Sequence, residues 1–357
     1  MPEWLVAGNE LRWLREEAMS FAESAPQYWV KGRDIMPTTT DPSEDFGRLA
    51  EPFRRELVAY GYRMLGSIDD AEEIVQDVYL EAWRGYDRFE GRASLRTWLY
   101  RIATRAFIRG VERRKRRPLP SHLSAPTLDP YAAVRAGSAE LVWLQPVPDS
   151  VLTGTVGDPA AVVAERHTMR LAFVAALQVL TPRQRAVLIL RDVLGLSASE
   201  VAAQLDLSVA AVNSALQRAR ARLPVDHDSV VEPSQARQRE LVDRYVAAFE
   251  NADVAGLVAV LAEDAMFEMP PMLTWFRSRA TIGEFLGARM RELGKASVVR
   301  TSANGQPAVA LYLGSRDGKR RLHSLHVLTV AAQGVSRVVS FQDIGMIRSF
   351  DLPASRS

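Results

Sequence analysis

Cysteine is absent from this chain of 357 residues. Its absence excludes disulfides, thiolate metal sites and cysteine nucleophiles, and it fits a reducing compartment, so we expect a cytoplasmic protein. Histidine is scarce, and of the five histidines only His323 and His326 are close in the sequence. Side chains three positions apart on a strand point to opposite faces, so we expect neither a metal site nor another cofactor.

Long uncharged apolar runs are also missing. The segment 1–35 carries charges throughout, which argues against a secretory signal or a membrane span there, and we expect no membrane partner. Two interpretations of this segment remain: Met36 is the true start of the protein, or the segment forms an amphipathic helix. The composition, 47% hydrophobic and 25% charged, is ordinary for a soluble protein with more than one buried core.

The segment 197–222, SASEVAAQLDLSVAAVNSALQRARAR, predicts two short helices around a tight turn. Ser197 and Glu200 have the spacing of a capping box, Asp206 tolerates the left-handed turn, and Ser208 can cap the second helix. The outward face of that helix would offer amide and guanidinium groups to DNA, through Asn213, Ser214, Gln217, Arg218 and Arg220. An ordinary helical hairpin is the alternative interpretation.

The net charge of +2 conceals a segregation of charge along the chain. Segment 67–81 has six acidic residues, no basic residue and apolar residues at helical spacing, which predicts an acidic amphipathic helix. Segment 101–117 has eight basic residues and one acidic residue, Glu112, above an apolar stripe. Taken separately, the acidic and the basic segment could each be an ordinary solvated surface without a binding partner.

Aromatic residues surround the basic run and favour nucleic acid as its partner. Unpaired bases stack on aromatic side chains beside arginines that neutralise phosphates. The five aromatic residues are Tyr86, Phe89, Trp98, Tyr100 and Phe107. Several of them must pack in the core, Trp98 among them, and we expect one or two to contact DNA directly.

A linker is predicted over residues 118–165, which contain seven prolines and one basic residue, Arg135. Within it, an apolar cluster followed by prolines is poorly suited to a free linker and suggests docking on a partner surface. The docking residues would be Trp143, Leu144, Pro146 and Pro148. The alternative is a short helix of the preceding module.

Beyond a second polar linker, residues 224–235, the pattern predicts helices over 240–261 and then strands. Apolar and β-branched runs are broken by Asn-Gly, Asp-Gly and Gln-Gly pairs, which indicates an antiparallel sheet of at least three strands.

The blocks DAEEIVQDVYLEAWR, RFEGRASLRTWLYRIATR, ERRKRR and LTPRQRAVLILRDVLGLSASEVAAQLDLSVAAVNSALQRARARL together resemble a sigma factor of the sigma-70 family, in its extracytoplasmic function group. The resemblance implies two all-α modules, residues 41–117 and 166–223, with residues 1–40 as an extension of uncertain status. It also implies core RNA polymerase and promoter DNA as partners. The clamp helices of the largest polymerase subunit would meet Asp70, Glu73, Gln76 and Asp77.

By the same resemblance, the basic run faces the minus-ten promoter element through Arg101, Arg105, Arg109, Arg113, Arg114, Arg116 and Arg117. The family often has asparagine and aspartate where this chain has Arg105 and Arg109, so we expect stronger phosphate binding and relaxed base discrimination there. The minus-thirty-five element would meet Arg183, Arg185, Ser208, Asn213, Ser214, Gln217, Arg218 and Arg220.

Residues 236–353 resemble the SnoaL-like domain of the nuclear transport factor two-like superfamily, on EDAMFEMPP, the WF pair and the HVLTV strand. The resemblance implies an α+β cone with a curved antiparallel sheet and an internal pocket for a small-molecule ligand. Pocket residues would be Glu268, Trp275, Phe276, His326 and Asp343, with Met269 as a further apolar wall. Some relatives are enzymes that use a pocket carboxylate.

Taken together, these patterns predict a transcription initiation factor without chemistry of its own, whose C-terminal domain regulates activity through the linker. Two other classes remain open. An enzyme of the SnoaL-like isomerase or hydrolase type could be fused to a DNA-binding module. An ordinary dimeric repressor would explain the helix-turn-helix but would leave the acidic helix without a role.

Overall fold

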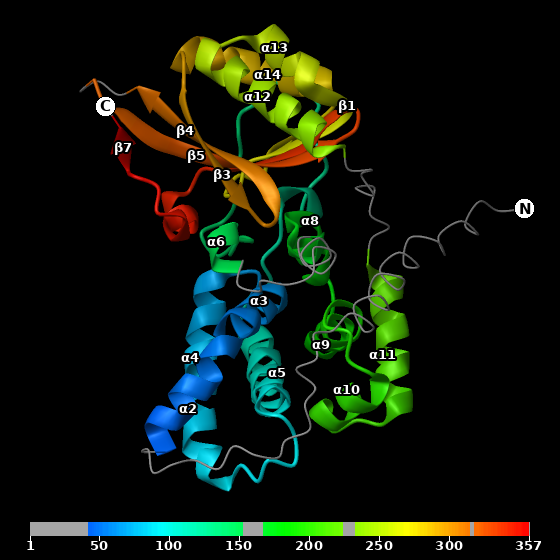
Figure 1. Ribbon diagram of the computed structural model, residues 1–357. Helices are drawn as coiled ribbons and strands as arrows, with labels where there is room; N and C mark the ends of the chain where they lie inside the picture. The colour runs from blue at the N-terminus through cyan, green and yellow to red at the C-terminus, as the bar shows by residue number, and fades with distance from the viewer. Residues whose placement is uncertain (1–41, 153–166, 224–232, 315–317, 357) are drawn as a thin grey trace, which may run out of the picture. The chain divides into compact units, whose positions relative to one another are not determined.

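The computed structural model describes residues 42–152, 167–223, 233–314 and 318–356 (Figure 1). The chain divides into two compact units, one formed by the residues up to Arg116 together with Val151–Asp226, the other by Arg117–Ser150 together with His227–Ser357. Both interpretations of the N-terminal segment, the start at Met36 and the amphipathic helix, concern residues outside the described ranges. Within those ranges no helix is long and apolar enough to cross a membrane.

The first unit begins with a bundle of helices. They are α2 (Pro42–Ala50), α3 (Arg54–Leu65), α4 (Ile68–Gly85) and α5 (Leu95–Arg113). Local signals set the boundaries: Gly66 ends α3 with a positive φ of 71°, and the Ser67 side chain accepts a hydrogen bond from the Asp70 amide at the start of α4. The predicted acidic helix is therefore confirmed.

Close packing at Gly61 joins α3 to α5 in the core of this bundle. A Cβ atom at Gly61 would lie 2.6 Å from the Phe107 ring, so only glycine allows this approach. Phe107 is fully buried and meets the Tyr60 ring edge to face, with centroids 5.2 Å apart. Tyr100 and Phe107 are thus core residues, whereas Trp98, which was also expected in the core, is only half-buried.

The remaining helices of the first unit are α8 (Leu171–Leu177), α9 (Pro182–Leu188), a π-helical turn (Ile189–Val193), α10 (Ala198–Leu205) and α11 (Val209–Arg222). Ser197 and Glu200 form the predicted capping box. Asp206 adopts the left-handed conformation with φ 54°, and Ser208 caps α11. The predicted helix-turn-helix is confirmed.

The described part of the second unit contains a sheet, two long helices, α12 (Gln235–Asn251) and α14 (Arg279–Leu293), and the short helix α13 (Val254–Val260). Its strands are β1 (Leu261–Glu268), β2 (Trp275–Arg277), β3 (Ser297–Ala303), β4 (Gln306–Gly314), β5 (Arg320–Ala331), β6 (Gly334–Phe341) and β7 (Ser355–Arg356). A 3-10 helix, Ile344–Phe350, precedes β7.

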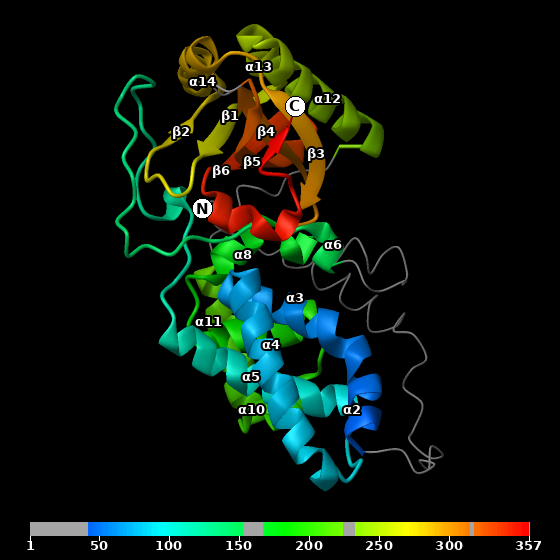
Figure 2. The same ribbon diagram turned by 90° about the vertical axis from the view of Figure 1, so that its left-hand side faces the viewer.

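The strand order is β2-β1-β6-β5-β4-β3, with β7 paired to β5 (Figure 2). All described pairs are antiparallel except β1 with β6, so the sheet is mixed rather than wholly antiparallel. Asn304 and Gly305, both with positive φ, form the predicted tight turn between β3 and β4.

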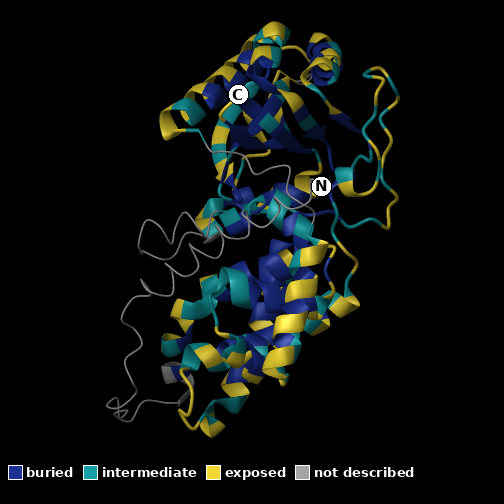
Figure 3. Cartoon of the chain, turned by 90° about the vertical axis from the view of Figure 1, so that its right-hand side faces the viewer, coloured by how far each residue is buried: buried dark blue, intermediate teal, exposed yellow. Residues whose placement is uncertain are grey.

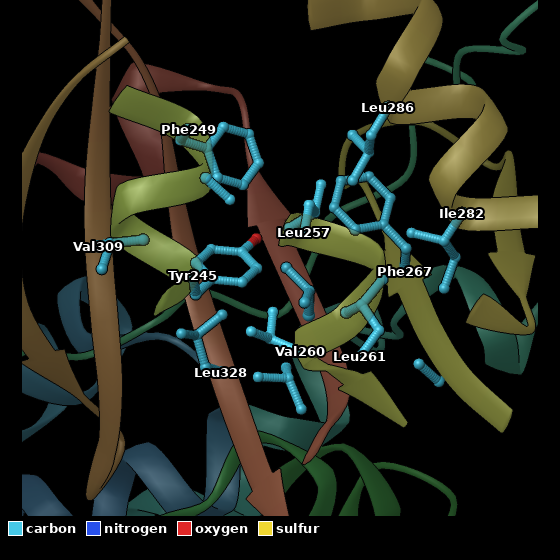
Figure 4. Close-up of a cluster of buried hydrophobic side chains, with 14 of the residues drawn as sticks. Tyr245, Phe249, Leu257, Val260, Leu261, Phe267, Ile282, Leu286, Val309 and Leu328 are labelled. Atoms are coloured by element: carbon cyan, nitrogen blue, oxygen red, sulfur yellow. The ribbon is translucent and has the colours of Figure 1, made fainter. Parts of the chain in front are cut away.

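The helices and the sheet of the second unit enclose one apolar core (Figures 3 and 4). Tyr245 and Phe249 of α12 lie in it together with Phe267 of β1 and Leu286 of α14. The spacing of Tyr245 and Phe249 is one helical turn, which places both rings on the buried face.

Residues 117–150, hereafter the strap, belong to the second unit and run beside β2 (Figure 2). The strap contains a short 3-10 helix, Pro120–His122, and leads into α6 (Asp149–Leu152). Isolated bridges join it to the helices and sheet of residues 235–356, hereafter the cone, at Thr127 with Phe276, Ala136 with Met272 and Pro148 with Ala303. The predicted linker is therefore not a free connection over this part.

Candidate functional sites

The outer face of α4 carries the predicted polymerase-binding residues. Glu73, Gln76 and Asp77 are exposed, Asp70 is half-buried, and the apolar positions between them face the core. Leu80 and Trp83 extend this face and are about half exposed, at 51% and 50%. These two side chains give α4 an apolar patch beside its acidic one.

The arginines of α5 form an exposed row one helical turn apart, at positions 101, 105, 109 and 113. Arg101 and Arg105 both reach Asp206 in the turn of the helix-turn-helix, at 3.2 Å and 2.5 Å. Arg109 lies 3.9 Å from Glu81.

The arginines that follow this row have different surroundings. Arg114 pairs with Glu73 at 2.8 Å and lies 3.4 Å from Asp70. Arg116 is exposed, whereas Arg117 belongs to the strap and donates to the Trp143 carbonyl oxygen. Of these three arginines, Arg114 is thus engaged by the acidic helix and Arg117 by the strap.

A ladder of partly exposed rings lies at the N-terminal side of α5. Tyr86 stacks on Phe89 with centroids 6.2 Å apart, and Phe89 contacts Trp98 at 5.0 Å. Tyr100 and Phe107, in contrast, are buried. These two cannot stack on bases without unfolding the bundle, so the candidate stacking residues reduce to Tyr86, Phe89 and Trp98.

On α11, four of the predicted DNA readers are exposed, namely Asn213, Ser214, Gln217 and Arg218. Arg183 at the start of α9 is exposed as well, and the Ser208 side chain accepts from the Ala211 amide as a helix cap. Arg220 differs, because it forms a bidentate pair with Asp192 at 2.9 and 2.6 Å. Its guanidinium faces the π-helical turn and is not available to a base in this arrangement.

Arg185 is buried, and the expectation that it contacts a phosphate is therefore wrong. The side chain is 1% exposed and donates to the carbonyl oxygens of Met64, Gln178 and Leu180 and to the Gln178 side chain. Burial, with a smaller effect of Arg116, lowers the pKa of Arg185 to about 10, which still leaves it charged at neutral pH. A guanidinium surrounded by carbonyl oxygens organises the protein interior and cannot reach DNA.

The cone contains a cavity of about 310 Å³. Its lining is mainly apolar and comes from α12, α14, four strands and adjoining segments. The lining residues are Val134, Phe249, Phe267, Met269, Phe285, Leu286, Arg289, Met290, Leu293, Gly294, Ala296, Leu311, Leu313, His323, Ser324, His326, Ser340 and Gln342. No aspartate or glutamate is in this lining. Among the described residues, no cluster of three or more side chains could hold a metal ion.

Both His323 and His326 line the cavity, which contradicts the expectation that they face opposite sides of a strand. The register shifts where Leu311 and Tyr312 pair with Ser324 and Leu322, which leaves His323 as the extra residue of a β-bulge. A bulge changes the alternation of side chains along the strand.

Of the predicted pocket residues, His326 and Met269 line the cavity and four others do not. Trp275 donates through its indole nitrogen to the Ser124 carbonyl oxygen at 2.9 Å, and Phe276 packs on Phe285. Asp343 is an exposed cap that accepts from the Gly345 amide. These three predictions of pocket position are corrected, because strand register and capping direct the side chains elsewhere.

Glu268, the remaining predicted pocket residue, is fully buried in a polar cluster. Arg337 on the neighbouring strand contacts it at 2.7 and 2.5 Å, and the Ser121 amide of the strap donates to it at 2.8 Å. A carboxylate with these partners is a structural anchor for the strap rather than a base facing a cavity.

All four predicted docking residues of the strap are buried: Trp143, Leu144, Pro146 and Pro148. Just beside them, Val147 and Asn304 exchange hydrogen bonds, since the Val147 amide donates to the Asn304 side chain at 3.0 Å and the Asn304 amide donates to the Val147 carbonyl oxygen at 2.9 Å. Trp143 lies in no helix, which excludes the alternative of a short helix of the preceding module.

Comparison with known proteins assigns two helical segments and the C-terminal segment of this chain to separate families. Residues 49–117 match the model of sigma-70 region 2, residues 170–223 that of sigma-70 region 4, and residues 242–340 that of the SnoaL-like domain. The chain is 44% identical over 318 residues to the ECF RNA polymerase sigma factor SigG of Mycobacterium tuberculosis, covering 87% of this chain and 85% of that protein.

A second relative is the ECF RNA polymerase sigma factor SigJ of the same organism, 29% identical over 61% of this chain and 62% of that protein. The crystal structure of SigJ shares the fold with a TM-score of 0.58 and 21% identity, over 88% of this chain and 100% of that one. The chain belongs to the extracytoplasmic function sigma factors of the sigma-70 family, and it is a transcription initiation factor with an added SnoaL-like domain.

Proposed function

We propose that the chain binds core RNA polymerase through the outer face of α4 and promoter DNA through α5 and α11. The separation of charge within one helical bundle carries this proposal. Acidic residues and two exposed apolar side chains gather on α4, and a row of arginines gathers on α5. One bundle therefore offers one face to a protein and another to a polyanion.

The minus-ten contact rests on the arginine row and the ring ladder. Arg101, Arg105, Arg109 and Arg113 would neutralise phosphates, while Tyr86, Phe89 and Trp98 would stack on bases. Stacking is available only to an unpaired base, so its free energy favours the open strand over the duplex. Promoter opening without ATP requires such a difference.

The minus-thirty-five contact rests on the exposed face of α11. Asn213, Gln217 and Arg218 carry amide and guanidinium groups that match base edges in the major groove. Arg183, exposed at the N-terminal end of α9, would contact phosphate. Arg220 would join them only after leaving Asp192.

We further propose that the SnoaL-like domain regulates rather than catalyses. No carboxylate lines its cavity, and Glu268 is held by Arg337 and the strap. General acid-base catalysis needs a titratable group within reach of the substrate at a suitable pKa. Burial lowers the pKa of His326 to about 3, which leaves it a weak base.

Runoff transcription with purified core polymerase tests the sigma function. The variant Asp77→Arg reverses one exposed charge of α4, and we expect a loss of core binding and of the transcript by about tenfold or more. Glu250→Arg, at an exposed position of α12, is the matched control and should transcribe normally. A full-length chain that yields no promoter-specific transcript, or an unaffected Asp77→Arg variant, contradicts the proposal.

A further inference from the structure

The cavity of the cone is completed by the strap. Val134 is a strap residue, and it lines the cavity together with side chains of the cone. Just after Val134, backbone hydrogen bonds at Arg135 and Gly137 tie the strap to the loop after β1. The Leu273 amide donates to the Arg135 carbonyl oxygen at 2.8 Å, and the Gly137 amide donates to the Pro271 carbonyl oxygen at 3.0 Å.

Three polar side chains form a hydrogen-bonded chain that ends at the cavity. Tyr245 contacts His326 Nδ1 at 2.8 Å, and His326 Nε2 contacts Ser324 Oγ at 3.1 Å. Burial raises the pKa of the Tyr245 hydroxyl well above 10 and lowers that of His326 to about 3. Both groups are therefore neutral at physiological pH.

Which group donates in each of these hydrogen bonds follows from the need of the Tyr245 hydroxyl proton for an acceptor. A buried tyrosine hydroxyl must donate somewhere, and His326 Nδ1 is the partner that the structure places next to it. If Tyr245 donates to Nδ1, then Nε2 carries the ring proton and donates to Ser324 Oγ. The Ser324 hydroxyl proton is then directed outward as a donor, and Ser324 lines the cavity.

We propose that this cavity binds a neutral, mainly apolar small molecule whose carbonyl oxygen accepts a hydrogen bond from Ser324, and that the strap forms part of the binding site. The proposal deepens the regulatory role proposed above and rests on it for the consequence in transcription. The binding site itself is testable without polymerase.

The cavity lining sets the class of ligand. Phenylalanine, leucine and methionine side chains dominate it, which suits a flat aromatic or alicyclic body. Arg289 is the one lining residue that always carries a charge, and it is paired with Glu292 at 2.9 Å. An ionised ligand would lose its hydration without gaining an unpaired counter-charge, so a neutral ligand is favoured.

A site shared by the strap and the cone couples ligand binding to strap docking. A ligand that contacts Val134 binds the docked state more tightly than the released state, and it shifts the equilibrium between them by the ratio of the two affinities. The strap directly follows α5 in the sequence. Occupancy of the cone can therefore change the freedom of the segment next to the DNA-binding arginines.

The naphthalene ketone PRODAN is a suitable probe, because its fluorescence reports both an apolar site and a hydrogen bond to its carbonyl oxygen. We expect saturable binding to the full chain. Ser324→Ala should weaken PRODAN binding about tenfold, the usual effect of one lost hydrogen bond. The same naphthylamine without the ketone should bind the wild type and Ser324→Ala equally. Absence of PRODAN binding, or equal losses for both probes, overturns the proposal.

Hydrogen exchange tests the role of the strap. PRODAN should slow exchange of the Arg135 and Gly137 amides, and Val134→Asp should weaken PRODAN binding about tenfold or more by placing a charge in an apolar wall. Tyr131→Asp, at an exposed strap position, is the matched control and should bind normally. If Val134→Asp does not fold, the exchange measurement on the wild type decides. Unchanged exchange with bound probe would refute a site shared with the strap, whereas normal transcription would leave the sigma function intact.

Discussion

At the scale of single residues, Asp206 has two roles. It ends α10 in the left-handed conformation, and it accepts hydrogen bonds from Arg101 and Arg105 of α5. A carboxylate paired with two arginines occupies the donors that the proposed contact would offer to a phosphate. If these arginines bind phosphates as proposed, the turn of one module competes with DNA for the other.

The variant Asp206→Asn tests this competition. Asparagine also tolerates the left-handed conformation, so the turn should persist while the ion pairs are lost. Because exposed ion pairs contribute only about 0.2–1 kcal/mol, we expect promoter DNA to bind about two- to fivefold more tightly. Fluorescence anisotropy with the holoenzyme measures it, with Asp243→Asn on α12 as control. Equal affinities would show that Asp206 does not compete.

The buried pair of Glu268 and Arg337 leads to a stability prediction. Glu268→Gln leaves a buried guanidinium without its counter-charge, which should lower the free energy of unfolding by about 3–5 kcal/mol. Urea denaturation measures the loss. Glu263→Gln, at an exposed position of the same strand, should be nearly neutral. Replacing both Glu268 and Arg337 with methionine should cost less than Glu268→Gln alone, and a larger loss in the double variant would contradict this explanation.

His326 leads to a pH prediction. Burial, with a smaller effect of His323, lowers its pKa to about 3, against about 6.5 in an unfolded chain. The unfolded state therefore binds more protons between these values, and stability falls as the pH falls through this window. We expect His326 to remove about 2 kcal/mol of stability between pH 7 and pH 5. Urea denaturation of His326→Gln should show that much less pH dependence, and identical pH profiles would disprove the assignment.

At the scale of elements, α5 has an apolar side in the bundle and a basic side outside it. Ala103 and Phe107 are buried, while the arginines at 101, 105, 109 and 113 are exposed. The helical period produces this division, since positions four apart share a face. If the basic side contacts DNA phosphates, it releases counterions from the DNA. The salt dependence of DNA binding therefore tests this contact.

Replacing Arg109 and Arg113 with alanine should flatten the salt dependence of promoter binding. Each phosphate contact adds about 0.9 to the log-log slope, so the double variant should lose about 1.8. Titration of the holoenzyme with promoter DNA at several salt concentrations measures the slope. Arg244→Ala, at an exposed position of α12 outside the cavity, serves as control. An unchanged slope would show that these arginines form a solvated surface and do not contact phosphates.

At the scale of the whole molecule, the proposed regulation makes the strap the segment through which the C-terminal domain acts on the sigma modules. It connects the sequence of α5 to that of the second module, yet its residues belong to the same compact unit as the cone. Glu268, Asn304 and the loop after β1 each hold it by hydrogen bonds. Any change that releases the strap should therefore resemble removal of the domain.

Trp143→Ala and deletion of residues 236–357 should change transcription in the same direction, because both remove the docked strap. Loss of a buried tryptophan costs about 3–5 kcal/mol, and this loss shifts the strap toward the released state. The combined variant should add little beyond the deletion. Runoff transcription compares the variants. Additive or opposite effects would show that strap and domain act independently.

Signals confined to a few neighbouring residues were readable from the sequence. The capping serines, the left-handed Asp206, the Asn-Gly turn and the acidic and basic faces of two helices were all predicted and are found. Each depends on groups separated by about one turn of chain, so composition and spacing suffice to determine it. The modules and the family followed from the order of these local patterns.

Contacts between distant residues were decided only by the tertiary structure. Arg185 and Arg220 have the composition of DNA contacts, but partners 121 and 28 residues away bind them. Glu268 resembles a pocket carboxylate until strand pairing places Arg337 beside it, and a single bulge turns His323 into the cavity beside His326. A charged side chain takes its role from the burial and the counter-charge around it, and those depend on packing between elements that no local pattern encodes.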